Sequence, residues 1–355
     1  MKSAYQPFKL DPTATFGAKF RAGALRRPVR LGVVGAGWIS GQYHLPSIAD
    51  LAKRRPDLVE FTALAEMDPE RRSKAKKAFK PLAVYEDLTT MLREAKLDCV
   101  EVIVKVTATK SVSIQCLKAG LPILLEKPPG KTVAEARAII AASKRTKMPA
   151  MVAFNRRWTP LLREAKAAVA GEKLLHVQCQ FFRHGRQDED FFSETGIHGL
   201  DALRFLAGDV KEVNFERVKL VKHLKPICQA RLVFQSGARG IFSGYPQSGC
   251  QVERYTLVTE NRAVFVQLPV GWLVDKPGLI QVFHKNKLVH QAQGKPAGTS
   301  QVDLAQGGGF YYEIEAFLEG VKAGRVVGPQ VAETVQSVIV GQALQHGPSG
   351  VRTKV

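Results

Sequence analysis

Two short segments carry the side chains best suited to acid–base chemistry. The first has the sequence EKPP at residues 126–129 and follows the apolar run 122–125. A lysine at the carboxyl end of a parallel strand lies where doubly wound sheets bind ligands, and there it can donate a proton or polarise an oxygen. The pattern therefore indicates that Lys127 is a catalytic candidate; the alternative is a surface lysine that pairs with Glu126.

The second segment holds three polar side chains at helical spacing, Glu194, His198 and Asp201. A helix over this segment would align all three on one face. A lone histidine is more often structural than catalytic, but flanking acids that orient its ring favour a general acid–base role. We therefore take His198 as the second catalytic candidate.

A glycine-rich turn lies near the start of the chain, between the apolar run 31–34 and a helical segment at 39–48. In such a turn Gly35 permits the sharp bend, and Gly37 lets backbone N–H groups approach a pyrophosphate at the helix N-terminus. Ser40 stands where a third small residue keeps the helix close to the strand. The spacing predicts a dinucleotide-binding turn; a strand that merely ends in glycine is the alternative.

An acidic residue follows the next expected strand, 59–65. Glu66 comes 29 residues after Gly37, whereas the dinucleotide pattern places an acid about 20 residues on, to bind the ribose hydroxyls. The charged segment 50–57 would account for a longer crossover. The alternative is that Glu66 is an ordinary solvated residue before a helix.

The elements that must position these residues alternate between strand and helix as far as residue 153. We expect strands at 99–104, 122–125 and 149–153, and helices from 69, over 86–96, up to 119 and over 133–142. This alternation predicts a parallel sheet with helices on both faces. From residue 174 to 293, β-rich segments joined by short turns predict antiparallel strands, and two helices at 310–323 and 331–346 close the chain.

The fold class that follows is α/β with two domains. We expect a polar, basic extension over residues 1–28, a Rossmann doubly wound parallel sheet over 29–153, and an α+β domain with a largely antiparallel sheet over 154–355. The extension either packs on the body or stays mobile.

The charge, the cysteine content and the apolar runs of the chain limit the kinds of partner that it is expected to bind. A net charge of +20 raises nucleic acid as a partner, but the basic residues are spread and no nucleic-acid-binding motif accompanies them. The positive field favours an anionic cofactor. Five scattered cysteines argue against a zinc site and against disulfides, so we expect no metal and a cytoplasmic location. No apolar run is long enough for a bilayer, so we expect no membrane association.

The chain resembles the Gfo/Idh/MocA oxidoreductase family over about residues 29–346. In that family a Rossmann domain with an E-K-P motif is joined to an open-faced sheet domain that commonly forms homodimers or homotetramers. The matching motifs are G-x-G-x-I-x-x-x-x-H at residues 35–44, A-E-M-D-P-E-R at 65–71, E-K-P at 126–128, N-R-R-W at 155–158, and a D-x-G-x-H-x-x-D variant at 194–201.

This resemblance assigns roles to individual residues. Lys127 and His198 would flank the reacting hydroxyl, with Glu194 in place of the usual aspartate, and Arg157 and Asp201 would also contact substrate. NAD is the expected cofactor, with NADP as the alternative. The residues that would contact the cofactor are Gly35, Gly37, Trp38, Ile39, Glu66, Lys105, Glu126 and Lys127.

The chain departs from the family where a Thr-Pro pair usually follows the fourth strand, because Lys105 and Val106 stand there, with Lys110 where a histidine usually follows. This loop borders the cofactor in the family, so the change could place a charge in the nicotinamide pocket.

The resemblance implies an NAD(P)-dependent oxidoreductase acting on a CH–OH group of a carbohydrate or polyol-like small molecule. One alternative is a dinucleotide-binding sensor or regulator without turnover, which the Lys105-Val106 departure favours; another is an NAD-dependent glycosidase. The segment Arg183-His184-Gly185-Arg186 indicates either an acidic sugar as substrate or a solvated loop.

Overall fold

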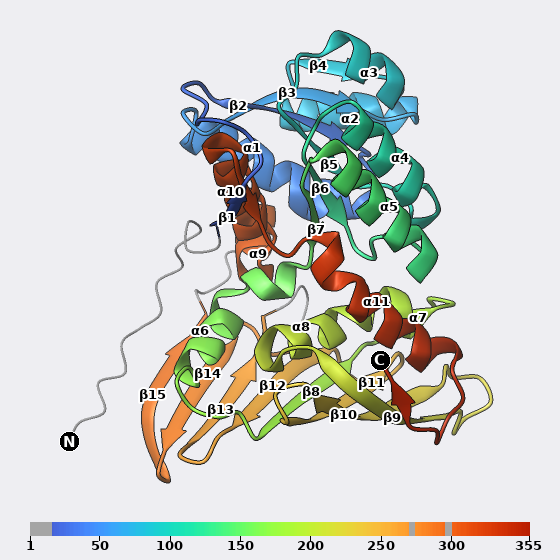
Figure 1. The fold of residues 1–355 in the computed structure, drawn as a ribbon, viewed down its shortest axis with the longest axis vertical. Coiled ribbons are helices and arrows are strands. Elements are labelled where there is room, and N and C mark those ends of the chain that lie inside the picture. Colours follow the sequence, from blue (N-terminus) through green and yellow to red (C-terminus); the bar gives the residue numbers. More distant parts are fainter. Residues whose placement is uncertain (1–15, 270–273, 295–299) are drawn as a thin grey trace.

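The computed structural model describes residues 16–269, 274–294 and 300–355, which form two large sheets with helices between them and a small two-stranded sheet (Figure 1). The six-stranded sheet is parallel throughout, in the order β4-β3-β2-β5-β6-β7. The nine-stranded sheet runs β15-β14-β13-β12-β8-β11-β10-β9-β17 and is antiparallel except where β8 lies beside β11. The predicted α/β class, with a parallel and a largely antiparallel sheet, is confirmed.

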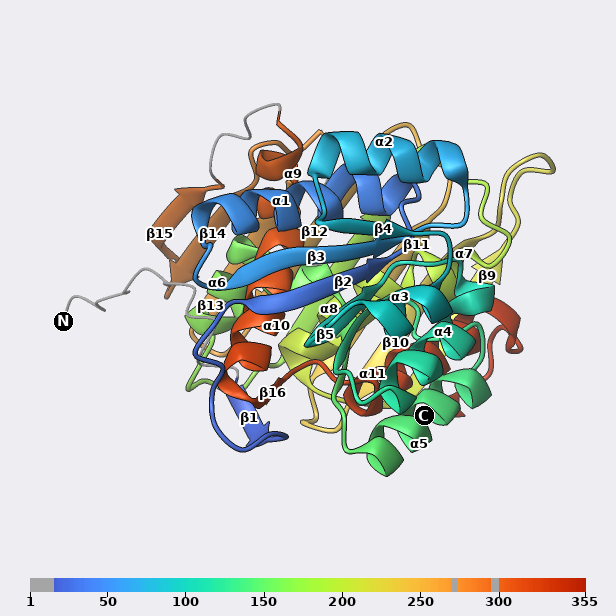
Figure 2. The same ribbon diagram turned by 90° about the horizontal axis from the view of Figure 1, so that it is seen from above.

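The parallel sheet has the strand order of a dinucleotide-binding fold, with two halves that diverge from β2 and β5. Its strands are β2 (Val29–Val34), β3 (Val59–Ala65), β4 (Ala83–Tyr85), β5 (Cys99–Val102), β6 (Ile123–Glu126) and β7 (Ala150–Ala153). Its helices are a π-helical turn η2 (Ser40–His44), α1 (Leu45–Arg54), α2 (Pro69–Phe79), α3 (Leu88–Glu94), α4 (Val106–Lys118) and α5 (Val133–Thr146). In Figure 2, α1 and α2 lie on one side of the sheet and α3, α4 and α5 on the other.

The nine-stranded sheet has helices on one face (Figure 1). Its strands are β8 (His176–Phe182), β9 (Val210–Val218), β10 (Ile227–Phe234), β11 (Arg239–Tyr245), β12 (Val252–Val258), β13 (Arg262–Gln267), β14 (Leu279–His284), β15 (Lys287–Gln293) and β17 (Thr353–Lys354). The helices that follow residue 154 in the chain are η3 (Asn155–Trp158), α6 (Pro160–Ala168), α7 (Phe191–Glu194), α8 (Ile197–Ala207), α9 (Gln301–Gly308), α10 (Phe310–Ala323) and α11 (Val331–His346). None of the helices in the described ranges covers the other face, and its use in a dimer or tetramer stays a prediction.

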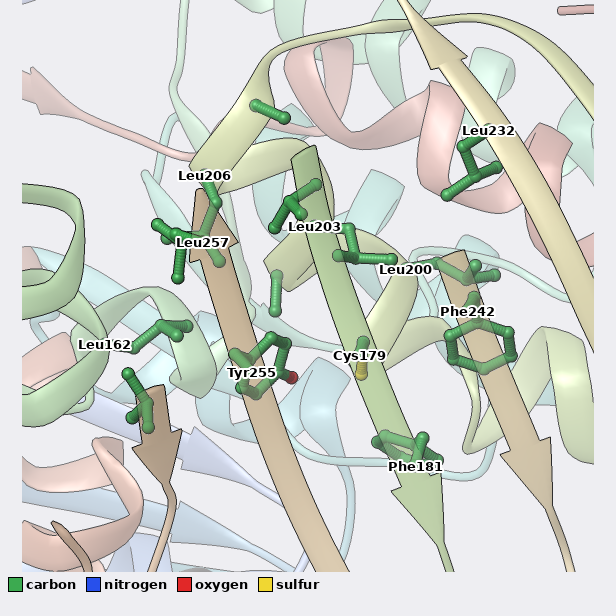
Figure 3. Close-up of a cluster of buried hydrophobic side chains, with 14 of the residues drawn as sticks. Leu162, Cys179, Phe181, Leu200, Leu203, Leu206, Leu232, Phe242, Tyr255 and Leu257 are labelled. Carbon is green, nitrogen blue, oxygen red and sulfur yellow. The ribbon is translucent and has the colours of Figure 1, made fainter. Parts of the chain in front are cut away.

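A large apolar cluster joins the covered face of this sheet to α6, α8 and α11 (Figure 3). Helix α8 approaches the strands closely at Gly199, where an added Cβ would lie 2.8 Å from the Phe181 ring, 2.9 Å from the Phe242 ring and 3.1 Å from the Cys179 sulfur. Only a residue without a side chain fits between helix and sheet at this distance. The small residue therefore fixes how deeply α8, which carries His198, sits on the sheet.

A second cluster packs α10 against the first sheet. Buried Ile314, Phe317 and Leu318 belong to the same core as Val29 and Leu31 of β2. This segment, placed after residue 154 in the sequence analysis, therefore packs with the parallel sheet. The division of the chain at residue 153 stays a prediction.

The first described residues pack on the body. Strand β1 (Phe16–Lys19) pairs antiparallel with β16 (Arg325–Val327), and Arg27 forms an ion pair with Asp98 at 2.5 Å. The rest of the expected extension, residues 1–15, lies outside the described residues. Within the described ranges, no helix combines the length and apolar content that crossing a membrane requires.

The contact at Gly199 gives a test of this packing. Gly199→Ala should lower the free energy of unfolding by about 1–3 kcal/mol, because the added methyl must displace aromatic rings of a close-packed core. Denaturant unfolding followed by circular dichroism measures the change. Gly249→Ala is the matched control, since a Cβ there meets nothing within 4 Å; equal stability of the two variants would contradict the close approach.

Candidate active site

The glycine-rich turn after β2 forms one end of a cleft of about 710 Å³. Gly35 has φ of +99°, and a Cβ there would lie 2.1 Å from the Ile103 carbonyl oxygen, so the turn requires glycine. The Ser40 hydroxyl donates to the Gly35 carbonyl at 2.8 Å and holds the following helix against the turn. The cleft wall includes most of the predicted cofactor residues, namely Gly35, Gly37, Trp38, Ile39, Glu66 and Lys105.

Glu66 stands at the end of β3, as the sequence predicts, and it also fixes the turn. One carboxylate oxygen accepts from the Ala36 backbone N–H at 2.6 Å, and the other accepts from the Asp68 backbone N–H at 3.0 Å. Each oxygen keeps a further lone pair. Arg71 lines the same cleft with a half-exposed side chain, so a cation lies close to the expected ribose position.

The Lys105 departure lies where the sequence analysis placed it. Lys105 is exposed in the wall of this cleft, immediately before α4. Lys110 is not part of that wall, and its ammonium lies 3.6 Å from a carboxylate oxygen of Glu135. The first change therefore adds a positive charge to the cleft, and the second does not.

A second cleft of about 520 Å³ adjoins the first. Trp38, Ile39 and Val104 line both, and Trp38 is 66% exposed at this junction. The second cleft contains Lys127 and His198, which come from β6 and α8. Two side chains that the sequence separates by about 70 residues thus face one volume next to the dinucleotide turn.

Lys127 extends from the end of β6 into this cleft. Its ammonium donates to the Glu194 carbonyl oxygen at 3.2 Å, and its backbone N–H donates to the Glu126 carboxylate at 3.0 Å. Burial lowers the pKa of Lys127, and Arg156 adds to this effect although Glu126 opposes it. The lysine is therefore held by a neutral acceptor and does not pair with the adjacent carboxylate.

His198 is a buried base in a positive environment. Its Nδ1 has no hydrogen-bond partner among the described residues, and its ring meets the Phe154 ring edge-on, with centroids 6.4 Å apart. Burial lowers the pKa of His198 well below its ordinary value, and the charges of Arg156 and Lys127 lower it further. The imidazole is consequently neutral near pH 7 and able to accept a proton.

The expectation that one helix carries Glu194, His198 and Asp201 is wrong at Glu194, because α8 contains only His198 and Asp201. Helix α7 ends at Glu194 and α8 begins at Ile197, so the chain turns at Thr195 before His198. The flanking acids form no hydrogen bond with His198, and the Glu194 carboxylate is not part of the cleft wall. What Glu194 supplies is its backbone oxygen, which accepts from Lys127.

Arg157 and Asp201, predicted to contact substrate, pair with each other. The guanidinium donates to both Asp201 oxygens at 2.7 and 2.9 Å, and the Ser337 hydroxyl donates to the same carboxylate at 2.8 Å. Neither residue lines the second cleft. The structure does not bring them to Lys127; they connect η3, α8 and α11 instead.

A buried network that the sequence analysis missed lies behind Lys127. His44 Nδ1 is 2.6 Å from a Glu101 oxygen, and His44 Nε2 is 2.9 Å from a Glu126 oxygen. Burial opposes the charged imidazole, but the two carboxylates outweigh it and raise the pKa of His44 well above its ordinary value. Glu313 lies nearby with both oxygens buried, and burial raises its pKa well above the usual range, so it is a neutral acid.

Two signals in the sequence point to this network. Glu101 interrupts the apolar strand sequence CVEV, and Glu313 is a fully buried acid in α10. A charged residue within an apolar buried element needs a partner. The partner itself, His44, is distant in sequence and was noted only as part of the glycine-rich motif.

Comparisons with known proteins show which proteins this chain is similar to. Residues 29–154 match the family model described as "Oxidoreductase family, NAD-binding Rossmann fold". D-apiose dehydrogenase of Paraburkholderia graminis is 30% identical over 191 residues, which are 50% of this chain and 49% of that protein, so the match spans about half of that relative. Inositol 2-dehydrogenase of Pseudomonas fluorescens is 24% identical over 336 residues, covering 89% of this chain and 93% of that one.

A solved structure of levoglucosan dehydrogenase, in complex with NADH and L-sorbose, superposes with a TM-score of 0.79. It is 17% identical and covers 93% of this chain and 99% of its own. At this identity the likeness establishes the shared fold, from the parallel sheet through the nine-stranded sheet.

The buried network predicts that removing His44 alone destabilises the protein more than removing His44 together with Glu101. His44→Leu should lower the free energy of unfolding by about 3–5 kcal/mol, because it leaves buried carboxylates without their counterion. The double variant His44→Leu with Glu101→Leu should regain part of this loss, since it removes a charge together with its partner. Urea unfolding of both variants measures the difference; a double variant less stable than the single one would contradict the ionic interpretation.

Proposed function

We propose, from the premise that this chain belongs to the Gfo/Idh/MocA oxidoreductase family, that it is an NAD-dependent oxidoreductase. Its reaction moves hydride between nicotinamide and a CH–OH group of a sugar- or polyol-like small molecule. The observation that carries the proposal is the junction at Trp38 and Ile39, where the dinucleotide cleft meets the cleft that holds Lys127 and His198.

The residues of the first cleft fit a dinucleotide. Gly37 has only one atom, a guanidinium nitrogen of Arg71 at 4.0 Å, within reach of an added Cβ, so backbone and ligand can approach closely there. Glu66 offers lone pairs at the end of the second strand, where ribose hydroxyls bind in this fold. Trp38, Ile39 and Val104 border the end that the first cleft shares with the cleft of Lys127. When bound, the nicotinamide supplies the site that accepts or donates hydride.

The side chains of the second cleft supply the proton chemistry. In oxidation, neutral His198 accepts the hydroxyl proton of the substrate, and the ammonium of Lys127 stabilises the negative charge that develops on the same oxygen. In reduction the roles reverse, and protonated His198 returns the proton. His198 is buried and Lys127 is partly buried, and water screens such groups less than exposed ones, which strengthens these interactions.

One feature favours binding without turnover, which is the positive charge of Lys105 in the cofactor cleft. A sensor or regulator would keep NAD affinity and lack NADH formation with any sugar. Retention of Lys127 and His198 in one cleft favours the enzyme.

The role of Glu66 predicts cofactor preference. The wild-type protein should bind NAD more tightly than NADP, because the Glu66 carboxylate repels a 2′-phosphate. Glu66→Ala should narrow this preference, since Arg71 would then face the phosphate without the opposing charge. Calorimetric titration of both dinucleotides measures it, with Glu70→Ala as the control for loss of an exposed acid. Tighter binding of NADP by the wild type would overturn the assignment.

The proposed roles of Lys127 and His198 predict that replacing either residue lowers the rate of hydride transfer, and that the two effects are coupled. Lys127→Met and His198→Ala should each reduce single-turnover hydride transfer by about 10²–10⁴-fold while NAD affinity changes little. The double variant should lose less than the product of the two single losses, as coupled catalytic groups do. Stopped-flow NADH absorbance with a sugar and polyol panel measures the rates, and cofactor titration gives the affinities.

A pH profile separates the catalytic role of His198 from a structural one. Because burial and neighbouring cations lower the pKa of His198 below 6.5, the acid limb of kcat/KM for oxidation should lie below pH 6.5 and should vanish in His198→Ala. Near-normal turnover in either single variant would remove that residue from the mechanism.

A further inference from the structure

The second cleft is lined by more positive than negative side chains. Its cationic residues come from β6, η3 and the segment after β8, namely Lys127, Arg156, Arg183 and Arg186. Among the described residues that line it, Glu126 is the one carboxylate, and its oxygens already face His44 and the Lys127 backbone N–H. The cleft therefore presents positive charge to whatever enters it.

The excess of positive charge continues beneath the cleft wall at Glu253. This buried carboxylate accepts from Arg156 at 3.0 and 2.9 Å and from Arg183 at 2.7 Å, so two guanidinium groups share one counterion. All three side chains are buried. Charges removed from water are costly unless they are paired. Among the residues that the structure describes, Glu253 is the one carboxylate that pairs with these two guanidinium groups, so one positive charge is left over. An anion in the cleft would complete the pairing.

Arg186 is the most accessible of these cations. Its Nε and Nη2 donate to Asp188, and Nη2 also donates to the Thr195 hydroxyl at 3.0 Å. Its Nη1 has no acceptor within the part of the chain that the structure describes, and 44% of the side chain is exposed. The guanidinium plane is thus fixed by two neighbours and keeps a free donor edge.

The segment that carries these arginines is not a freely solvated loop. The Arg186 backbone N–H donates to the Pro246 carbonyl at 3.2 Å, and His184 Nδ1 lies 2.9 Å from the Ser248 carbonyl. Arg183 itself is 4% exposed. The sequence left two interpretations of this segment open, a binding site for an acidic substrate and a solvated loop. Its packing favours the binding site.

We propose, on the basis of the function proposed above, that the substrate is a polyhydroxylated molecule with an anionic group, a carboxylate or a phosphate. Arg186 binds that group through its free edge, with the unbalanced charge of Arg156 and Arg183 behind it, while a hydroxyl of the same molecule lies at Lys127 and His198. Guanidinium groups match the planar geometry of carboxylates and the oxygens of phosphates. A positive cleft also speeds the arrival of anions at low salt.

Matched pairs of ligands test the proposal by calorimetry on the full chain loaded with NADH. The pairs differ in one group: D-gluconate with D-sorbitol, D-galactonate with galactitol, and D-glucose 6-phosphate with D-glucose. At least one anion should bind about tenfold or more tightly than its neutral partner, and its affinity should fall as NaCl rises. The acid pairs and the phosphate pair distinguish the two anionic groups.

Substitution of Arg186 tests whether this residue binds the anionic group of the ligand. Arg186→Gln should lose about tenfold in affinity for the preferred anion and leave the neutral partner unchanged. Arg93→Gln, an exposed arginine outside both clefts, is the matched control and should change neither. No anion preference in any pair, or an unchanged preference in Arg186→Gln, would overturn the proposal.

The same panel separates this inference from the function on which it rests. Reduction of NAD by neutral members alone would leave the oxidoreductase standing and overturn the anionic substrate. Anion-selective binding that depends on Arg186, without NADH formation from any member, would support the anion site and count against the oxidoreductase.

Discussion

A buried imidazole between two carboxylates is the interaction on which the rest of the site depends. His44 is the last residue of η2, and its two ring nitrogens face Glu101 of β5 and Glu126, the last residue of β6. Glu126 also lines the second cleft and accepts from the backbone N–H of Lys127. Removing one partner of a buried ion pair leaves the other charge buried and unpaired. The network therefore fixes the end of η2 relative to β5 and β6, next to Lys127.

The positive charge around His198 has two opposing effects on the proposed chemistry. Each unit of lowered pKa removes about 1.4 kcal/mol of driving force for proton uptake, so the neutral imidazole is available but weakly basic. The same cations stabilise the oxygen that loses the proton, and in a site with little water this stabilisation is large. In the proposed reaction, proton transfer therefore depends more on the acidity of the substrate hydroxyl than on the basicity of His198.

Local patterns predicted much of the fold and part of the site. The apolar run before Gly35 and the helical spacing over 310–323 and 331–346 are signals contained within one element, and both agree with the structure. Strand β4 has three residues, too few for an alternating pattern, and the parallel pairing of β8 with β11 depends on a return of the chain that no local pattern encodes.

The site residues also fall into two groups, those predicted from one element and those that depend on contacts between distant parts of the chain. The E-K-P lysine was found because its position follows from one strand end. The pairing of His44 with Glu101 joins residues 57 apart, and the turn at Thr195 that separates Glu194 from His198 interrupts a spacing that otherwise suits a helix. Charge sharing at Glu253 required three elements to be packed together, and only the folded chain shows it.

The most direct test of the account is the crystal structure of the full chain with NADH and D-gluconate bound. We expect the nicotinamide at the junction formed by Trp38 and Ile39, a gluconate hydroxyl within hydrogen-bond distance of both Lys127 and His198, and the carboxylate at Arg186. A nicotinamide bound away from this junction, or Lys127 and His198 contacting different ligands, would contradict it.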